Sequence, residues 1–185
     1  MEDIFFLNVY IARNSTVDVY GNYLLVVSIL TIASLVSMMG LDSALSKLVP
    51  EYSVSGASPL LKGVVVFGFF VVFLVSVFVA VFLYLSGVVS VADHVLLFFP
   101  ALVLSFYLQS VFRAFKEVAL SRFFDQILRP SVFVVLLFLY SLFYDGVLEL
   151  SHVITFFSAS VLVSLLLSFW AVKLPNKSNN KQILL

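Results

Sequence analysis

The sequence predicts an all-α protein, a polytopic bundle of about six transmembrane helices. Three observations predict this fold. Of the 185 residues, 63% are hydrophobic and 11% are charged; the apolar residues gather in long uncharged runs; and the basic residues fall in alternate connections between those runs. Soluble domains are about half apolar and about a quarter charged. The chain is therefore predicted to lie in a membrane.

Five runs carry no formal charge and are the candidate spans: Tyr23–Leu41, Gly63–Leu85, Val95–Phe112, Ser131–Tyr144 and Val153–Val172. A bilayer core of ~30 Å needs about 20 helical residues. The fourth run reaches that length only if Ile127–Pro130 is included, with Arg129 extending its charge to the membrane interface. Strands of a membrane barrel would alternate apolar and polar residues, whereas Val64–Leu85 is apolar at nearly every position. Helices are therefore predicted.

The first apolar piece, Ile4–Ala12, is too short to cross a membrane by itself. Its start is acidic, at Glu2 and Asp3, whereas a signal peptide starts with basic residues. Two interpretations stay open: a half-helix on the membrane surface, or a first spanning helix whose beginning is missing from this chain, and we favour the second. The predicted organisation is a bundle over residues 1–173 and a polar tail over residues 174–185.

The basic residues are distributed unevenly between the two sides of the predicted bundle. Nine of them lie on one side: Lys47, Lys62, Arg113, Lys116, Arg122, Arg129, Lys173, Lys177 and Lys181. The alternate connections, Ser86–His94 and Asp145–His152, carry no Lys or Arg, and Arg13 alone is assigned to that side. The positive-inside rule then predicts a multi-pass protein of the cell membrane with both termini in the cytoplasm.

The stretch GLDSALSKLVPEY, Gly40–Tyr52, has the pattern of an amphipathic helix. Its apolar face holds Ala44, Leu45, Leu48, Val49 and Tyr52. Its polar face holds Ser43, Lys47 and Glu51. We expect this helix to continue the second span toward the cytoplasm. It is either an ordinary helix end or a polar face turned toward a water-filled cavity.

A second amphipathic stretch, Ser110–Pro130, contains an apolar stripe that changes phase near its middle. The two halves of the stripe point to opposite sides of a straight helix, so we expect a turn near Ala119–Ser121. The basic residues of this predicted hairpin either anchor anionic lipid headgroups or contact a substrate.

Small residues recur at helical spacing inside the runs. These are Ser28, Thr31, Ser34, Ser37 and Gly40 at every third position, and Ser160, Ser164 and Ser168 at every fourth. Small residues let helices approach closely in lipid, so we expect helix contacts there. The sequence has no phosphate-binding loop, zinc-protease motif, nucleophile triad or cysteine. It predicts no enzyme activity, no metal site and no cofactor.

One long stretch resembles a known family. In YIARNSTVDVYGNYLLVVSILTIASLVSMMGLDSALSKLVPEY, the matching points are Ala12-Arg13, Tyr20-Gly21 with Tyr23, Gly40-Leu41-Asp42 with Ala44-Leu45, and Glu51-Tyr52. They resemble the N-terminal signature of the Wzx-like oligosaccharide flippases of polysaccharide biosynthesis, in the multidrug/oligosaccharidyl-lipid/polysaccharide exporter superfamily. The later RAFKEVALSRFFDQILRP is similar to the family's connection between the fourth and fifth helices.

The resemblance implies two helical lobes around a central cavity, of which this chain covers the N-terminal one. Transporters built from repeats place the substrate between them. The expected function is translocation of a lipid-linked oligosaccharide or polysaccharide precursor. The alternatives are a non-transporting assembly or scaffold subunit, or a multidrug antiporter of the same superfamily. The chain is a fragment, a truncated product, or a lobe that pairs with another copy.

The resemblance also implies partners and a binding site. The expected partners are membrane lipid, a polyprenyl-linked oligosaccharide and a second lobe or second copy, with no nucleic acid. Arg13 is expected to face the cavity and attract the pyrophosphate of the substrate, because arginine holds phosphate in a bidentate manner. Lys47 is the second choice, and Asp42 lies on the same expected cavity face.

The charge asymmetry predicts a labelling pattern. Because the chain lacks cysteine, single cysteines at Ser90 and Ser178 can be labelled in intact cells with a membrane-impermeant reagent. The residue at 90 should react and the residue at 178 should not, since only the first is predicted to lie outside. The reverse pattern would overturn the orientation.

Overall fold

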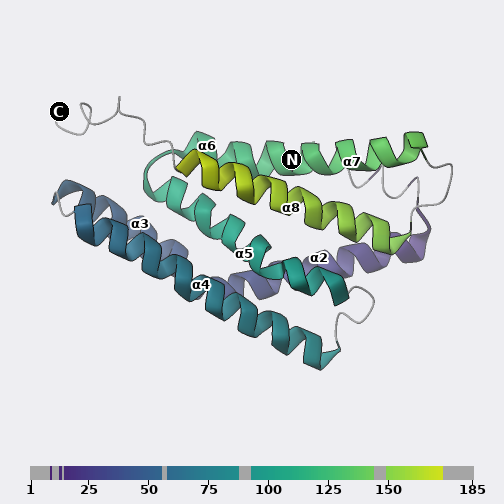
Figure 1. Cartoon of the computed structure of the whole chain (residues 1–185), viewed down its shortest axis with the longest axis horizontal. Coiled ribbons are helices and arrows are strands. Elements are labelled where there is room, and N and C mark those ends of the chain that lie inside the picture. The colour runs from purple at the N-terminus through teal and green to yellow at the C-terminus, as the bar shows by residue number, and fades with distance from the viewer. Residues whose placement is uncertain are drawn as a thin grey trace.

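The computed structural model describes residues 9, 13, 15–55, 58–87, 93–143 and 149–172 (Figure 1). Within these residues the chain is helical between short connections and contains no strand, so the predicted all-α class is confirmed. The apolar piece Ile4–Ala12 falls almost wholly outside the described residues, and so does the predicted polar tail.

The helices follow the predicted runs. In chain order they are α2 (Val17–Met38), α3 (Leu41–Val54), α4 (Ser58–Ser86), α5 (Asp93–Ala114), α6 (Val118–Arg122), the π-helix η2 (Phe123–Leu128), α7 (Arg129–Phe143) and α8 (Leu150–Val172). The segments α6, η2 and α7 form one continuous helical rod. The fourth predicted run, which looked too short to cross a membrane by itself, is therefore part of a helical segment that is long enough to do so. Five helical segments of the described chain are long and apolar enough to cross a membrane. The chain is a membrane-embedded bundle.

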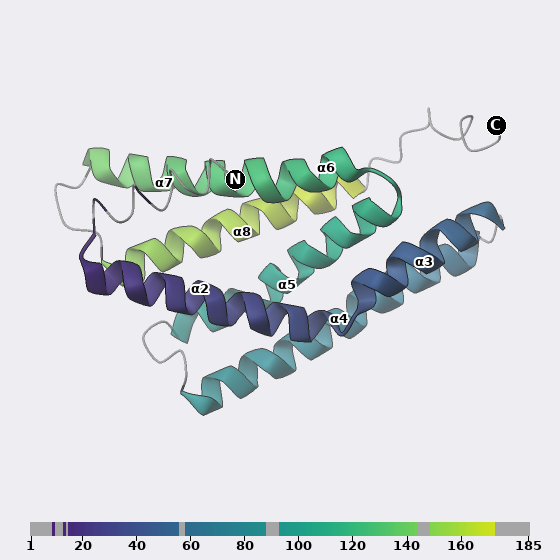
Figure 2. The same cartoon turned by 180° about the vertical axis from the view of Figure 1, so that it is seen from behind.

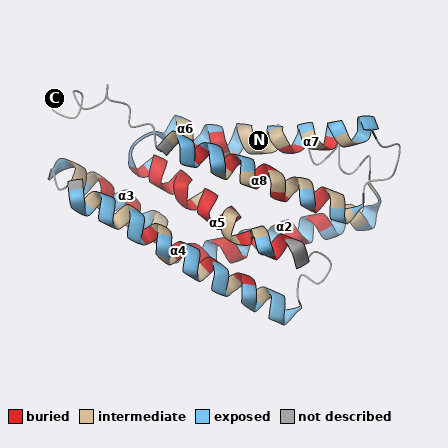
Figure 3. Cartoon of the chain, in the orientation of Figure 1, coloured by how far each residue is buried: buried red, intermediate tan, exposed pale blue. Residues whose placement is uncertain are grey.

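Helix α5 is the centre of this bundle. It packs against α2, α3, α4 and α8, and 72% of its candidate span is buried, against at most 39% for the other spans. Figure 3 shows it as the ribbon with the most continuous burial. Figures 1 and 2 show α7 along the side of α8 that faces away from α4. The exposed apolar side chains of α4 and α7 therefore form lipid-facing surfaces.

We call one end of the bundle the basic end. There α3 joins α4 and α5 joins α6 (the left side of Figure 1). Its described basic residues are Lys47, Lys62, Arg113, Lys116 and Arg122. The opposite end holds the start of α2 and the starts of α5 and α8.

Helix α3 has the predicted faces but does not continue α2. Leu45 and Val49 are buried, whereas Lys47 and Glu51 are exposed, so the amphipathic pattern is confirmed. The expected continuation is wrong, because the backbone breaks where φ is +45° at Met39 and +75° at Gly40. Two left-handed residues in succession end the α-helical hydrogen bonding. The predicted polar face therefore belongs to a separate helix, α3, which begins at Leu41.

The turn after α5 lies earlier than expected. Lys116 takes a left-handed φ of +65°, its N–H bonds the Arg113 carbonyl at 3.0 Å, and the Glu117 N–H bonds the Phe112 carbonyl at 2.9 Å. This is the Schellman end of a helix. Ala119–Ser121, where the turn was predicted, lies inside α6. The wider turns of the π-helix η2 are a second reason why the apolar stripe of Ser110–Pro130 changes phase.

The small-residue pattern is confirmed in α8 and in half of α2. Ser160, Ser164 and Ser168 are all buried between helices, as are Ser34 and Ser37. Ser28 and Thr31 are exposed instead. The buried hydroxyls mostly bond carbonyls of their own helix; that of Ser37, for example, donates to Ala33 O at 2.8 Å. The hydroxyl of Ser168, by contrast, has no hydrogen-bond partner. The small side chains let the helices pack closely, and most of their hydroxyls are paired inside the protein.

Helices α4 and α5 are in close contact at Gly68. A Cβ at this position would lie 2.5 Å from the Tyr107 hydroxyl oxygen and 3.2 Å from its Cζ. That hydroxyl donates a hydrogen bond to the Val65 carbonyl at 2.8 Å. Glycine is needed here for space, since the Tyr107 ring fills the position that a side chain would take.

This contact predicts that Gly68→Ala lowers the stability of the protein by about 1–3 kcal/mol through overpacking. Gly63→Ala on the same helix is the matched control, because nothing lies within 4 Å of its added Cβ. Thermal unfolding in detergent measures both. Tyr107→Phe should recover part of the Gly68→Ala loss by removing the hydroxyl. Equal melting temperatures for the two alanine variants would contradict the packing.

Candidate functional site

The structure does not bring the three predicted site residues together. Arg13 is exposed and precedes α2 at the opposite end, whereas Asp42 and Lys47 lie on α3. The 22 residues of α2 separate them by about 33 Å at 1.5 Å per residue. A single phosphate group cannot contact Arg13 and Lys47 in this conformation. Their binding roles stay predictions.

Asp42 forms an ion pair that joins α3 to the last turn of α5. Its Oδ1 lies 3.1 Å from a guanidinium nitrogen of Arg113. The same nitrogen donates to the Ser110 hydroxyl at 2.9 Å. Both partners are about half-exposed, at 44% for the Arg113 side chain and 50% for that of Asp42. The pair is therefore accessible to an ion in solution or in a headgroup.

Lys47 lies on the same helix as Asp42 but does not join this pair. It is exposed on α3 and forms no ion pair with any described residue. The sequence analysis predicted Asp42 and Lys47 as site residues but did not predict a partner for Arg113. The signal for the pair was weak, since the two residues are 71 positions apart and only the fold brings them together.

Arg129 lies inside the bundle. Its guanidinium carbon is 5.3 Å from the ring centroid of Phe106 on α5 and 5.1 Å from that of Phe157 on α8. Asp125, one turn earlier, approaches to 3.8 Å. Only 14% of the Arg129 side chain is exposed. The prediction that it extends to the membrane interface is wrong, because two aromatic faces hold the cation between the helices.

Arg129 also lies within a candidate membrane span, the 26 residues of Val118–Phe143. Insertion of an arginine at mid-bilayer costs about 2.5–3.5 kcal/mol on translocon scales. Such residues usually mark a functional site. One sequence signal could have revealed it: an acid four residues before a base in an otherwise apolar stretch.

An aromatic cluster packs next to Arg129 and ties three helices together. Tyr23 of α2, Phe133 of α7 and Phe157 of α8 have ring centroids 5.9–6.4 Å apart. Tyr23 and Phe133 are buried. This cluster fixes the position of the Phe157 ring, which is one of the two faces against the guanidinium.

A polar atom without a partner lies in the same region. Gln109 of α5 is 2% exposed, and its amide nitrogen has no hydrogen-bond acceptor. Within the described residues, no group of three or more potential metal ligands occurs.

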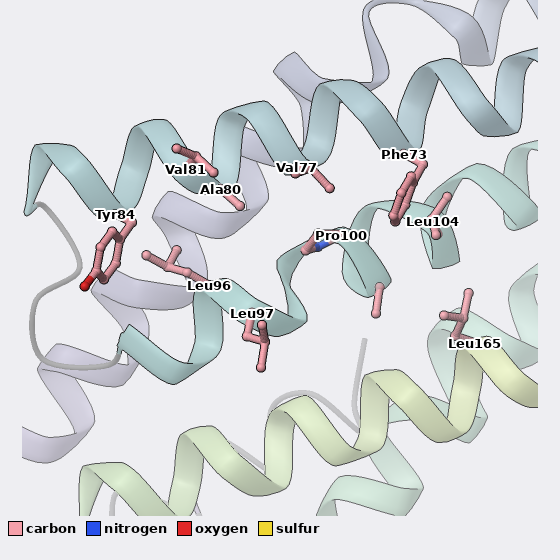
Figure 4. A pocket seen from close by; sticks show the side chains of 11 residues that line it. Phe73, Val77, Ala80, Val81, Tyr84, Leu96, Leu97, Pro100, Leu104 and Leu165 are labelled. Carbon is pink, nitrogen blue, oxygen red and sulfur yellow. The ribbon is translucent and has the colours of Figure 1, made fainter.

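An apolar groove with a volume of about 650 Å³ lies between α4 and α5. Figure 4 shows Pro100 of α5 facing it, with Phe73 near one end and Tyr84 near the other. Proline removes one backbone hydrogen bond from α5. The lining is almost wholly hydrocarbon, so the groove offers no group for chemistry.

Comparisons of the sequence and structure with family models, with curated proteins and with solved structures found no match.

The Asp42–Arg113 pair predicts a small, salt-dependent stabilisation. Asp42→Asn and Arg113→Gln should each lower stability by about 0.2–1 kcal/mol, and the double variant should lose less than the sum of the two. The coupling should shrink at high salt, because exposed charges are screened. A double-mutant cycle on melting temperatures in detergent measures it. Additive losses at low salt would contradict the pair.

Proposed function

We propose that the chain is one lobe of a flippase-type transporter, which moves a lipid-linked oligosaccharide or polysaccharide precursor across the cell membrane. The accessible Asp42–Arg113 pair is the observation that carries the proposal. It places an arginine with an exchangeable partner at the basic end of a membrane bundle. The resemblance of Tyr10–Tyr52 to the flippase signature supports the same function.

Arg113 suits the diphosphate of such a lipid. Its fork of N–H donors can hold two phosphate oxygens, and phosphate offers more charge than the single carboxylate of Asp42. Binding would then release Asp42 and loosen α3 from α5. Because α3 is separate from α2 at Met39-Gly40, the helix can move without bending α2. Lys47, on the same helix, adds a second positive charge.

The orientation belongs to this proposal. The basic end faces the cytoplasm, where precursors of this kind are assembled on their lipid, and both termini lie on that side. Arg13 then lies at the outer surface, where it would contact the diphosphate after translocation. The partners are membrane lipid, the polyprenyl-linked substrate and a second lobe, whether in another copy or in another chain.

The second lobe follows from alternating access, which needs two bodies that move about a site between them. Asp42 and Lys47 would otherwise lie beside lipid at a cost in free energy. We therefore expect no translocation from a single copy of this chain in a vesicle. Reconstitution at one copy and at many copies per vesicle, with a fluorescent polyprenyl-diphosphate sugar, tests this. Transport at one copy per vesicle would show that one lobe suffices.

The site itself predicts graded losses of transport. In vesicles with many copies, or together with the partner lobe, Arg113→Gln should slow translocation by about tenfold, as expected for the loss of a bidentate phosphate contact. Lys47→Gln and Arg13→Ala should have smaller effects, and Arg13→Lys should retain part of the function. Lys62→Gln, an exposed base of the same end, is the control and should be neutral.

Two outcomes would contradict the proposal. Unchanged transport in Arg113→Gln, Lys47→Gln and Arg13→Ala would remove the assigned site. No transport under any condition, by a chain that still associates with other membrane proteins, would favour the scaffold alternative.

A further inference from the structure

The guanidinium of Arg129 has far more hydrogen-bond donors than the described residues satisfy. It carries five N–H groups, yet it forms no hydrogen bond within 3.5 Å to any described residue. Its contacts are the rings of Phe106 and Phe157 and a carboxylate oxygen of Asp125 at 3.8 Å. Aromatic faces attract the charge but accept no strong hydrogen bond. Most of the five donors are therefore without an acceptor among the described residues.

Gln109 faces the same region from α5. Phe106 contacts Arg129, and Phe112 stacks on Phe124 at 5.8 Å, so this side of α5 faces the rod of α6, η2 and α7. Gln109 lies three residues from each ring, and at 100° per residue its side chain leaves the helix between their directions. It therefore leaves α5 on the side of these two rings. Its buried amide nitrogen is a second donor without an acceptor.

The rod has a π-helix at this level, directly before Arg129. The six residues of η2 have the wider hydrogen bonding of a π-helix, which is frequent at functional sites. Ser164 of α8 reaches across to the carbonyl of Phe124 at 3.4 Å. A hydrogen bond from the neighbouring helix α8 therefore supports the backbone of η2 in addition to the bonds within the π-helix.

We propose that Arg129 and Gln109 form a binding site for a phosphate oxyanion inside the bundle. A phosphate group supplies the several acceptor oxygens that these donors lack, and its charge replaces Asp125 as the partner of the guanidinium. The side chain of Asp125 is 36% exposed and lies 3.8 Å from the guanidinium, so it can turn away from Arg129 when the anion binds. The site is separate from the Asp42–Arg113 pair and does not depend on the transport proposal.

The oxyanion is either a free phosphate or the headgroup of a lipid, and two binding experiments distinguish these sources. In the first, inorganic pyrophosphate is titrated into the purified full chain in detergent, with acetate at equal ionic strength as the control. In the second, the chain is placed in phosphatidylcholine nanodiscs with and without phosphatidic acid. Thermal stabilisation reports binding in both, since a ligand that binds the folded state raises the melting temperature.

Four variants test the residues. Arg129→Gln should weaken binding by about tenfold or more, and Arg129→Lys by less, because lysine keeps the charge but loses the fork. Gln109→Leu should weaken binding several-fold. Arg122→Gln is the matched control, because Arg122 is an exposed base of the same rod whose described partner is Gln126.

Asp125→Asn gives the decisive readout and retains Arg129. If Asp125 competes with the anion, its removal should tighten binding several-fold even though the variant loses an ion pair. A merely structural pair predicts a lower melting temperature with no gain in binding. That result, or absence of stabilisation by both pyrophosphate and phosphatidic acid, would overturn the site. Equal weakening by Arg122→Gln and Arg129→Gln would also overturn it.

Discussion

The structure depends on one constraint: a polar group inside lipid must find its partner within the protein. Ser37 of α2 and Ser160 of α8 meet it by bonding carbonyls of their own helices. The Tyr107 hydroxyl meets it across a helix interface, on the Val65 carbonyl. The burial of α5 follows, because this helix carries several polar side chains and would be poorly solvated by hydrocarbon. Arg129 meets the constraint only in part, with two rings and a distant carboxylate.

Much of the fold could be predicted from the sequence, because lipid imposes a simple rule of length and polarity on each span. The runs that begin at Tyr23, Gly63, Val95 and Val153 each became a long helix. The faces of α3 were predictable for a similar reason, since its apolar residues repeat at 3.6. The positions of the turns were harder to predict from the sequence. Lys116 adopts a left-handed conformation that glycine usually takes, and nothing in its residue type indicates this.

The site was less predictable than the fold, because its residues meet only through packing. Asp42 could be named from the family pattern, but its partner Arg113 belongs to a distant helix. Arg129 was predicted to reach the membrane interface, as a long cation at a helix start often does. The reason it stays inside lies in Phe106 and Phe157, which come from two other helices. Local sequence carries no information about such a three-helix contact.

The central place of α5 has a consequence for biogenesis. Helix α4 is the most apolar candidate span and exposes most of its surface, so it is stable in lipid as soon as the translocon releases it. Helix α5 follows it out of the ribosome with Gln109 and several serines, and one of its neighbours, α8, is synthesised after the intervening α6, η2 and α7. The nascent chain must therefore hold α5 against α4 until α8 arrives. Gly68, which lets those two helices touch early, is thus a residue of assembly as well as of the finished bundle.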